Sequence, residues 1–161
     1  TPLYSSAASD VYKRQSYFCM VDKCRQMAHL ITYLTFNGNC REAMSFYRDC
    51  LGGELQLETV AASSASAQFP QPMREFILQA TLSKDNLVLM ATDMVGEDGL
   101  SRGNAVSILI DCNSKKELQH YFKKLSHKGQ ATHPVGKTFW GAWFGGLTDK
   151  FGNHWLLTCR G

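Results

Sequence analysis

Several features that define common protein classes are missing from this sequence. No apolar run approaches the roughly 20 residues that a membrane-spanning helix requires. There is no Cys-x-x-Cys spacing, no His-Glu-x-x-His motif and no Asn-x-Ser/Thr glycosylation site. We also recognise no signal peptide, with its basic start, apolar middle and cleavage site. These absences argue against a membrane protein, a zinc enzyme of the commonest kind and a disulfide-stapled secreted domain.

Charge is scarce as well, at 19% charged residues and a net charge of +3. The first 26 residues contribute +2 of that, because four basic residues oppose two acidic ones (Lys13, Arg14, Lys23 and Arg25 against Asp10 and Asp22). Residues 27–161 therefore carry only +1. A nucleic-acid-binding domain normally has a basic face on its folded part, so we expect no nucleic-acid partner and no membrane partner.

The cysteines give no pairing pattern. Cys40 and Cys50 lie at opposite ends of one predicted helix, which is too far apart for a disulfide. Scattered thiols without paired spacing are typical of a reducing compartment, so the sequence predicts a cytoplasmic protein. The six cysteines are Cys19, Cys24, Cys40, Cys50, Cys112 and Cys159.

The segment 1–26 does not resemble the rest of the chain. It shows neither strand nor helix periodicity, and its piece SSAASDVYKRQ resembles a translated cloning or adapter remnant. We predict that residues 1–26 are non-native or disordered, and that residues 27–161 form a single domain. A genuine flexible tail is the alternative.

Two helices are indicated by their capping residues. Asn39 is followed three residues later by Glu42, and Ser114 by Glu117, the spacing of a capping box. Apolar residues then recur at helical spacing in both segments. Glycines are expected to end the two helices, at Gly52-Gly53 and at Gly129.

Strand-like runs surround both helices in the same order. The first helix is preceded by His29–Phe36 and followed by Glu54–Val60, Glu75–Leu82 and Leu87–Thr92. The second is preceded by Ala105–Asp111 and followed by Gln130–Val135, Thr138–Gly145 and His154–Cys159. The sequence thus predicts an α+β fold of two tandem βαβββ modules with curved, mainly antiparallel sheets. Module 1 covers about 29–92, a glycine-rich linker 93–103, and module 2 about 104–160; residues 61–73 form a long loop.

Three stretches carry a resemblance to a known family. NGNCREAMSFYRDCLGGEL, LVLMATDM and KTFWGAWFGGLTDKFGNHW resemble segments of PhnB-like proteins, a branch of the glyoxalase/bleomycin-resistance (vicinal-oxygen-chelate) superfamily that includes the extradiol dioxygenases. The resemblance covers about residues 29–160. It implies paired βαβββ modules whose concave sheet faces hold a ligand, and it implies a homodimer.

Many members of that superfamily bind a divalent metal through four side chains on strands. The matching positions here are Ile31, Met90, Val106 or Ser107, and Leu156. None of these side chains is a competent ligand for a divalent metal, which requires imidazole or carboxylate. The chain is therefore expected to bind no metal. We also find no glycine-rich loop between the first strand and helix that would hold S-adenosylmethionine, so no cofactor is expected.

The ligand-binding candidates are residues that the resemblance and the strand pattern place toward a cavity: Tyr33, Met90, Ser107, Trp140, Trp143 and Leu156. On a single strand over 138–145, Trp140 and Trp143 would point to opposite faces. An aromatic-walled pocket is one interpretation of the tryptophans, and packing in the core or at a dimer interface is the other.

Catalytic residues are not identified by any motif. Asp93 and Asp149 lie at strand ends and are candidates for a general base, with Tyr33 offering a hydroxyl. Aspartates at strand ends more commonly serve turns. Among the histidines, His133 and His29 are ligand candidates, and His154 is expected to face away from Leu156.

Three functional hypotheses remain open. The first is a metal-free dimer that binds an unidentified small molecule. The second is a metal-dependent lyase or dioxygenase of the superfamily, or an acid–base enzyme using the aspartates. The third is a resistance protein that sequesters a drug, which the weak net charge does not favour.

Overall fold

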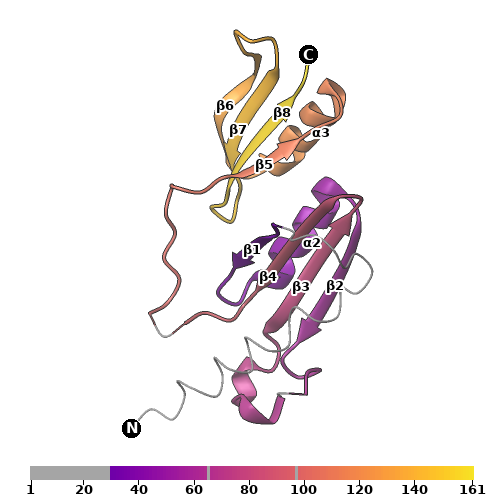
Figure 1. Ribbon diagram of the computed structural model, residues 1–161. Helices are drawn as coiled ribbons and strands as arrows, with labels where there is room; N and C mark the ends of the chain where they lie inside the picture. Colours follow the sequence, from indigo (N-terminus) through magenta and orange to yellow (C-terminus); the bar gives the residue numbers. More distant parts are fainter. Residues whose placement is uncertain (1–29, 65, 97) are drawn as a thin grey trace. The chain divides into compact units, whose positions relative to one another are not determined.

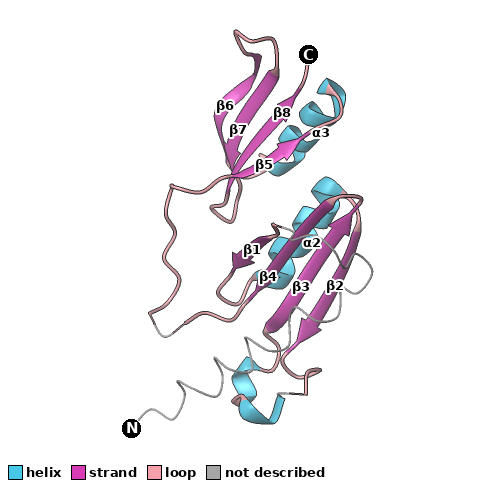
Figure 2. Ribbon diagram, in the orientation of Figure 1, coloured by secondary structure: helices cyan, strands magenta, loops and turns pink. Residues whose placement is uncertain are grey.

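The computed structural model describes residues 30–64, 66–96 and 98–161. Residues 1–26, predicted to be non-native or disordered, lie outside the described residues, as does His29. The elements follow in the order β1 (Thr32–Thr35), α2 (Cys40–Leu51), β2 (Glu54–Thr59), η1 (Ser66–Gln68), η2 (Gln71–Met73), β3 (Ile77–Lys84), β4 (Leu87–Thr92), β5 (Ile108–Asp111), α3 (Lys115–Leu125), β6 (Gln130–Lys137), β7 (Trp143–Thr148) and β8 (His154–Cys159). This order confirms the predicted repeat of βαβββ, which Figures 1 and 2 show as two groups of strands.

The two modules repeat one sheet topology. The first sheet has the strand order β1-β4-β3-β2, and the second has β5-β8-β7-β6. In each sheet the first strand pairs parallel to the last, while β3 and β4, β6 and β7, and β7 and β8 pair antiparallel. A helix lies between the first two strands of each module because strands that do not form a hairpin need a longer connection.

Two compact units divide the described chain, and the boundary runs through α2. The first unit contains residues 30–44 and 55–96, and the second contains residues 45–54 and 98–161. The second half of α2 thus belongs to the unit that contains the second sheet.

The helix α2 begins where the sequence predicts. Its first residue, Cys40, follows Asn39, and its end coincides with Gly52 and Gly53, whose φ angles are +81° and +98°. Glycine adopts these angles without strain, so the two glycines end the helix. At the other end, the Cys40 amide donates a 2.9 Å hydrogen bond to the Asp93 carboxylate.

The helix α3 confirms its predicted start but not its predicted end. The Ser114 hydroxyl accepts a 3.1 Å bond from the Glu117 amide, and the Glu117 carboxylate accepts one of 2.8 Å from the Asn113 amide. The helix ends at Leu125, four residues before Gly129. Gly129 is needed for another reason, since a Cβ there would lie 2.3 Å from the Thr148 carbonyl oxygen. The glycine allows two backbone segments to approach.

The strand predicted over 138–145 is also displaced. Residues 138–142 form the β6–β7 turn instead, closed by a 2.8 Å bond from the Thr138 amide to the Ala142 carbonyl, with Gly141 at φ +93°. The strand β7 begins only at Trp143. The predicted strand was wrong over residues 138–142 because a strand cannot continue through a turn.

The core consists of apolar side chains from the strands and the two helices. In the first unit it includes Phe36, Met44, Ile77, Leu82 and Leu89, and in the second Leu118, Leu125, Leu147, Trp155 and Leu157. Each amphipathic helix buries its apolar stripe, which leaves one face of each sheet available for other roles.

Candidate functional site

Each sheet presents two chemically different faces. In the first sheet, Leu89 pairs with Leu82 and Ala91 with Ala80, and these four apolar side chains are buried on one face. Because neighbours along a strand alternate between faces, the other face carries the remaining side chains. We call it the helix-distal face, since the apolar face is the one that suits an amphipathic helix.

Two sequence candidates meet on the helix-distal face of the first sheet. Tyr33 on β1 pairs with Met90 on β4, which pairs in turn with Thr81 on β3. Met90 and Thr81 are buried, at 7% and 4% exposure, whereas Tyr33 is 37% exposed. The three residues form one row of thioether and hydroxyl groups across the sheet.

Two consecutive glycines identify the faces of the second sheet. A Cβ on Gly145 would lie 3.0 Å from the Phe122 ring of α3, so Gly145 faces the helix. A Cβ on Gly146 would lie instead 3.1 Å from His133 Nδ1, 3.1 Å from Thr132 Oγ1 and 3.2 Å from Leu156 Cδ2. Gly146 therefore belongs to the helix-distal face, and these three side chains cover it.

A β-bulge produces this arrangement. The pairing of β6 with β7 shifts between Ala131 and His133, and again between His133 and Gly136. A bulge places two residues of one strand opposite a single residue of its partner and redirects their side chains. Thr132 and His133 can consequently both reach Gly146, which a regular strand would not allow.

Further polar and apolar groups surround Gly146 on the same face. His154 Nδ1 and Thr148 Oγ1 form a 2.8 Å hydrogen bond across β8 and β7. The Phe144 ring packs edge-on against the His133 ring, with centroids 6.2 Å apart. We call this set the histidine face, and it comprises Thr132, His133, Phe144, Gly146, Thr148, His154 and Leu156.

The sequence prediction for His154 was wrong. The strand β8 runs without a bulge against β7, so His154 and Leu156, two residues apart, share a face. Strand periodicity alone contained this signal. The position of Thr132 beside Gly146 had no such signal, because the residue pattern does not reveal a β-bulge.

The other ligand-binding candidates lie elsewhere. Trp143 is on the helix-proximal face, where the Lys115 ammonium lies 3.6 Å from the centre of its ring. Trp140 is on the β6–β7 turn and 66% exposed. Ser107 is exposed and immediately precedes β5. Of the six candidates, the structure thus joins Tyr33 with Met90 in the first unit and places Leu156 on the histidine face.

Asp149 lies at the centre of a buried hydrogen-bond network. One carboxylate oxygen accepts bonds from Tyr47 Oη at 2.6 Å and Trp155 Nε1 at 2.8 Å. The other accepts bonds from the amides of Phe151 and Asn153, at 2.8 and 3.0 Å. A carboxylate whose two oxygens already bind four protein donors is poorly placed to take a proton from a substrate. The contacts favour the turn interpretation.

Asp93 has a similar position in the first unit. It is 3% exposed, and its two oxygens accept the amide hydrogens of Cys40 and Ile77, at 2.9 and 3.0 Å. The carboxylate joins the start of α2 to the start of β3. A negative charge at a helix N-terminus is also favourable, which again supports a structural role.

Titration behaviour of the buried groups agrees with this interpretation. Burial, reinforced by the negative charge of Asp149, raises the pKa of the Tyr47 hydroxyl far above its usual range. Burial likewise raises the pKa of Cys50 to about 11 and that of Cys112 to about 12. These groups stay protonated at neutral pH, so neither thiol has the character of a nucleophile.

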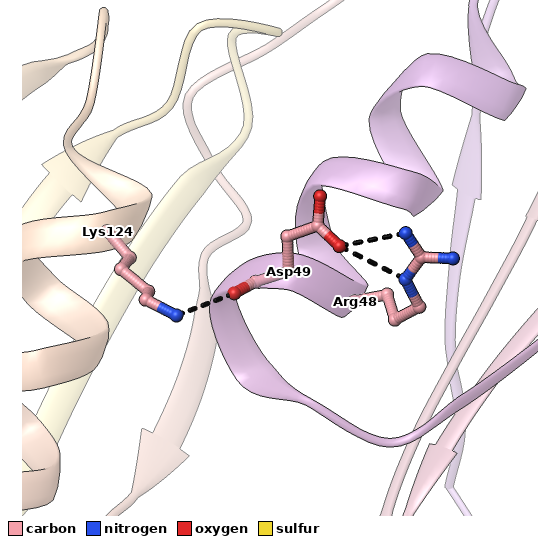
Figure 3. Close-up of polar contacts among 3 residues, drawn as sticks. All are labelled: Arg48, Asp49 and Lys124. Carbon is pink, nitrogen blue, oxygen red and sulfur yellow. Dashed lines mark hydrogen bonds and ion pairs between the residues drawn. The ribbon is translucent and has the colours of Figure 1, made fainter.

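A lysine of α3 binds the C-terminal turn of α2. Lys124 Nζ donates a 2.8 Å hydrogen bond to the Asp49 carbonyl, as Figure 3 shows beside the Arg48–Asp49 ion pair. A cation at a helix C-terminus satisfies a carbonyl that has no partner within the helix. The contact is structural.

Two negative findings apply to the described part of the chain. Within residues 30–64, 66–96 and 98–161, no group of three or more histidine, cysteine or acidic side chains is arranged to hold a metal ion. In the same ranges, no helix has the length and apolar character to cross a membrane.

Comparison with solved structures identifies the class of protein. A glyoxalase/bleomycin resistance protein from Albidiferax ferrireducens T118 matches with a TM-score of 0.54 at 14% identity, covering 81% of this chain and 98% of that one. At this identity the likeness concerns the fold. The tandem βαβββ modules have the fold of that glyoxalase/bleomycin resistance protein.

Closer matches identify the family. The sequence profile described as 3-demethylubiquinone-9 3-methyltransferase matches residues 28–158. Protein PA1353 of Pseudomonas aeruginosa is 35% identical and matches with a TM-score of 0.72, covering 83% of this chain and 98% of that one. A PhnB protein of Bacillus cereus that shares the methyltransferase description is 24% identical, with a TM-score of 0.64 over 83% of this chain and all of that one. The chain belongs to this family, the PhnB-like branch of the superfamily.

Proposed function

We propose that this protein binds a small organic molecule without a metal ion. The observation that carries the proposal is the histidine face, where Phe144 and Leu156 supply apolar contact area and His133 and His154 supply hydrogen-bonding groups. Binding sites for small molecules combine an apolar lining with a few polar groups in this way.

The residues at the superfamily's metal positions support the absence of a metal. The family resemblance matches Met90 and Leu156, on β4 and β8, to two of these positions, and neither side chain offers an imidazole or a carboxylate. Tyr33 and Met90 on the first sheet and Leu156 on the second are proposed as ligand contacts. The proposal includes no role for Asp93 or Asp149 in chemistry.

Methyl transfer is not part of the proposal, despite the description that the family carries. A dinucleotide- or nucleoside-binding α/β fold places a glycine-rich turn after its first parallel strand. Here the connection from β1 to α2 is Phe36-Asn37-Gly38-Asn39, with one glycine, and it leads into a mixed sheet. This segment offers little backbone for holding S-adenosylmethionine.

We also propose that the protein is a homodimer in the cytoplasm. Phe139 and Trp140 on the β6–β7 turn are 95% and 66% exposed, and their rings stack edge to face with centroids 4.4 Å apart. Large aromatic side chains exposed together are typical of surfaces that contact another protein. Among the described residues, Cys40, Cys50, Cys112 and Cys159 form no disulfide, which supports a reducing compartment.

The metal-free proposal is tested by elemental analysis of the full chain. Separate samples are dialysed against Zn²⁺, Ni²⁺, Mn²⁺ and Fe²⁺, then against metal-free buffer, and the metal per chain is measured. We expect well below one metal ion per chain in every case, and unchanged thermal stability with each ion.

About one ion per chain, lost in a His133→Asn or His154→Asn variant, would contradict the proposal. That result would favour the second hypothesis, a metal-dependent lyase or dioxygenase. The His127→Asn variant is a matched control, because His127 is an exposed histidine that follows α3 in the same unit.

A further inference from the structure

We propose that Cys112 and Cys159 form a site of reversible oxidation, at which a low-molecular-weight disulfide such as oxidised glutathione converts the two thiols into an intramolecular disulfide. Both cysteines belong to the second unit, where Cys159 is the last residue of β8 and Cys112 directly follows β5. The inference goes beyond the proposed function, because neither residue belongs to the histidine face.

The sheet register places the two cysteines opposite each other. The strands β5 and β8 pair in parallel, and the last pair of their register is Asp111 with Thr158. One step further along both strands, Cys112 is opposite Cys159. The strands are still hydrogen-bonded at this point, since the Cys112 amide donates a 2.7 Å bond to the Thr158 carbonyl.

The separation of neighbouring strands suits a disulfide. Strands in a sheet are about 4.8 Å apart, and the Cα atoms of a disulfide are about 4.4–6.8 Å apart. Opposite residues of a parallel pair also project to the same face of the sheet. The pair is enclosed by protein, because Cys112 is 6% and Cys159 3% exposed, and both are free thiols.

Each sulfur at present contacts a backbone carbonyl instead of the other sulfur. Cys112 Sγ lies 3.9 Å from the Ile110 oxygen, and Cys159 Sγ lies 3.2 Å from the Arg160 oxygen. Thiols are weak hydrogen-bond donors, so rotation of the two side chains costs little. The structure thus shows the reduced form of the pair.

Electrostatic effects agree with the short distance between the thiols. Burial, followed by the negative charges of Glu117, Cys159 and Asp111, raises the pKa of Cys112 to about 12. In the closed sheet this thiol stays protonated and reacts slowly. Oxidation therefore requires local opening of β5, which is a short edge strand with only β8 as its neighbour in the sheet.

The reaction is a thiol–disulfide exchange in two steps. In the opened form, one cysteine loses its proton, and its sulfur attacks a sulfur of oxidised glutathione. A mixed disulfide forms and one glutathione leaves. The second cysteine then loses its proton and attacks the mixed disulfide, which forms the Cys112–Cys159 bond and releases the second glutathione. The two protein protons end on the two glutathione thiols, so the protein is oxidised by two electrons and glutathione disulfide is reduced.

The test oxidises the full chain under native conditions with millimolar oxidised glutathione, blocks free thiols with N-ethylmaleimide and maps tryptic peptides by mass spectrometry. Cleavage at lysine and arginine leaves Cys112 in the peptide 103–115 and Cys159 in the peptide 151–160. We expect these two peptides to be joined at least tenfold more often than any other two cysteine peptides of residues 30–161. Dithiothreitol should separate them.

Two further measurements connect the cross-link to the fold. The oxidised protein should melt about 5 °C or more above the reduced protein, because the bond closes a loop of residues 113–158. The same oxidation in guanidinium chloride should lose the tenfold preference, because pairing in the unfolded chain depends on separation along the sequence and not on sheet register.

Variants locate the effect. Cys112→Ser and Cys159→Ser should each abolish the rise in melting temperature on oxidation. Cys50→Ser is the matched control, because Cys50 is a buried free cysteine of the same unit, and this variant should still give the joined peptides. Circular dichroism confirms that each variant folds, and the wild-type peptide map does not depend on any variant.

A wild-type map in which Cys112 and Cys159 are both recovered with N-ethylmaleimide, or each joined to glutathione, would overturn the inference. A joined peptide that appears only in guanidinium chloride would overturn it as well, because the fold would then not bring the thiols together. Either result leaves the proposed small-molecule site untouched, and the elemental analysis tests that site separately.

Discussion

At the scale of single residues, Tyr47 is the clearest case of a buried polar side chain whose hydroxyl is hydrogen-bonded on both sides. It is fully buried, its hydroxyl donates to Asp149, and it accepts a 2.7 Å bond from Asn153 Nδ2. The Arg102 guanidinium adds a further hydrogen bond to this network by donating to Asn153 Oδ1 at 2.9 Å. Removing the Tyr47 hydroxyl takes one hydrogen-bond partner from the buried Asp149 carboxylate and one from Asn153, which lowers stability.

We predict that Tyr47→Phe lowers the free energy of unfolding by about 1–3 kcal/mol at pH 7, since Asp149 and Asn153 each lose a partner. The raised pKa of Tyr47 adds a pH dependence. Above about pH 10 the unfolded state releases the tyrosine proton and the folded state keeps it, so the wild type loses up to about 1.4 kcal/mol per pH unit. Urea unfolding at pH 7, 9 and 11 measures both effects.

The advantage of the wild type over Tyr47→Phe should therefore shrink as the pH rises above 10. Tyr33→Phe is the matched control, because the Tyr33 side chain is 37% exposed. If the difference in the free energy of unfolding between wild type and Tyr47→Phe stays constant from pH 7 to pH 11, the prediction is contradicted.

At the scale of elements, the ends of helices and strands depend on glycines with different functions. Gly52 and Gly53 end α2 through positive φ angles. Gly129 acts through its missing side chain, because its position is pressed against the backbone of Thr148 and Asp149. The connection from α3 to β6 consequently has no room for a larger residue.

Gly129→Ala is expected to lower the free energy of unfolding by about 1–3 kcal/mol, because a Cβ would lie 2.3 Å from the Thr148 oxygen and the backbone must shift. Gly103→Ala is the control, as nothing lies within 4 Å of its Cβ position. It should change stability by less than about 0.5 kcal/mol. Chemical unfolding measures the free energy of unfolding of both variants. Equal losses would contradict the prediction that the close contact at Gly129 destabilises an alanine there.

At the scale of the whole molecule, the exposed Phe139 and Trp140 of the β6–β7 turn lead us to expect a homodimer. We predict that light scattering finds a particle of twice the 18.0 kDa chain mass at micromolar concentration. A Phe139→Ser/Trp140→Ser double variant should shift the population toward the monomer, because it removes the exposed aromatic pair.

Val106→Ser is the control for that experiment, since Val106 is 78% exposed and lies outside the turn. A wild-type protein that remains monomeric at these concentrations would overturn the dimer proposal. A dimer that survives the double variant would place the interface elsewhere on the chain.

The sequence by itself determined the order of elements and the family. Capping residues marked the starts of both helices and Gly52-Gly53 marked the end of α2, because these signals act over three or four residues. The strand of His154–Cys159 was predicted to the residue. The alternation of β8 also contained the shared face of His154 and Leu156, although the prediction did not use it. Local physics is sufficient for such features because they depend on neighbours along the chain.

The tertiary structure alone decided which side chains meet. The bulge in β6 turned Thr132 and His133 toward Gly146, and the β6–β7 turn removed Trp140 from the strand. The carboxylate of Asp149 joined Tyr47, which precedes it by 102 residues. These outcomes depend on pairing register and on contacts between distant segments, and a pattern read along the chain does not contain either.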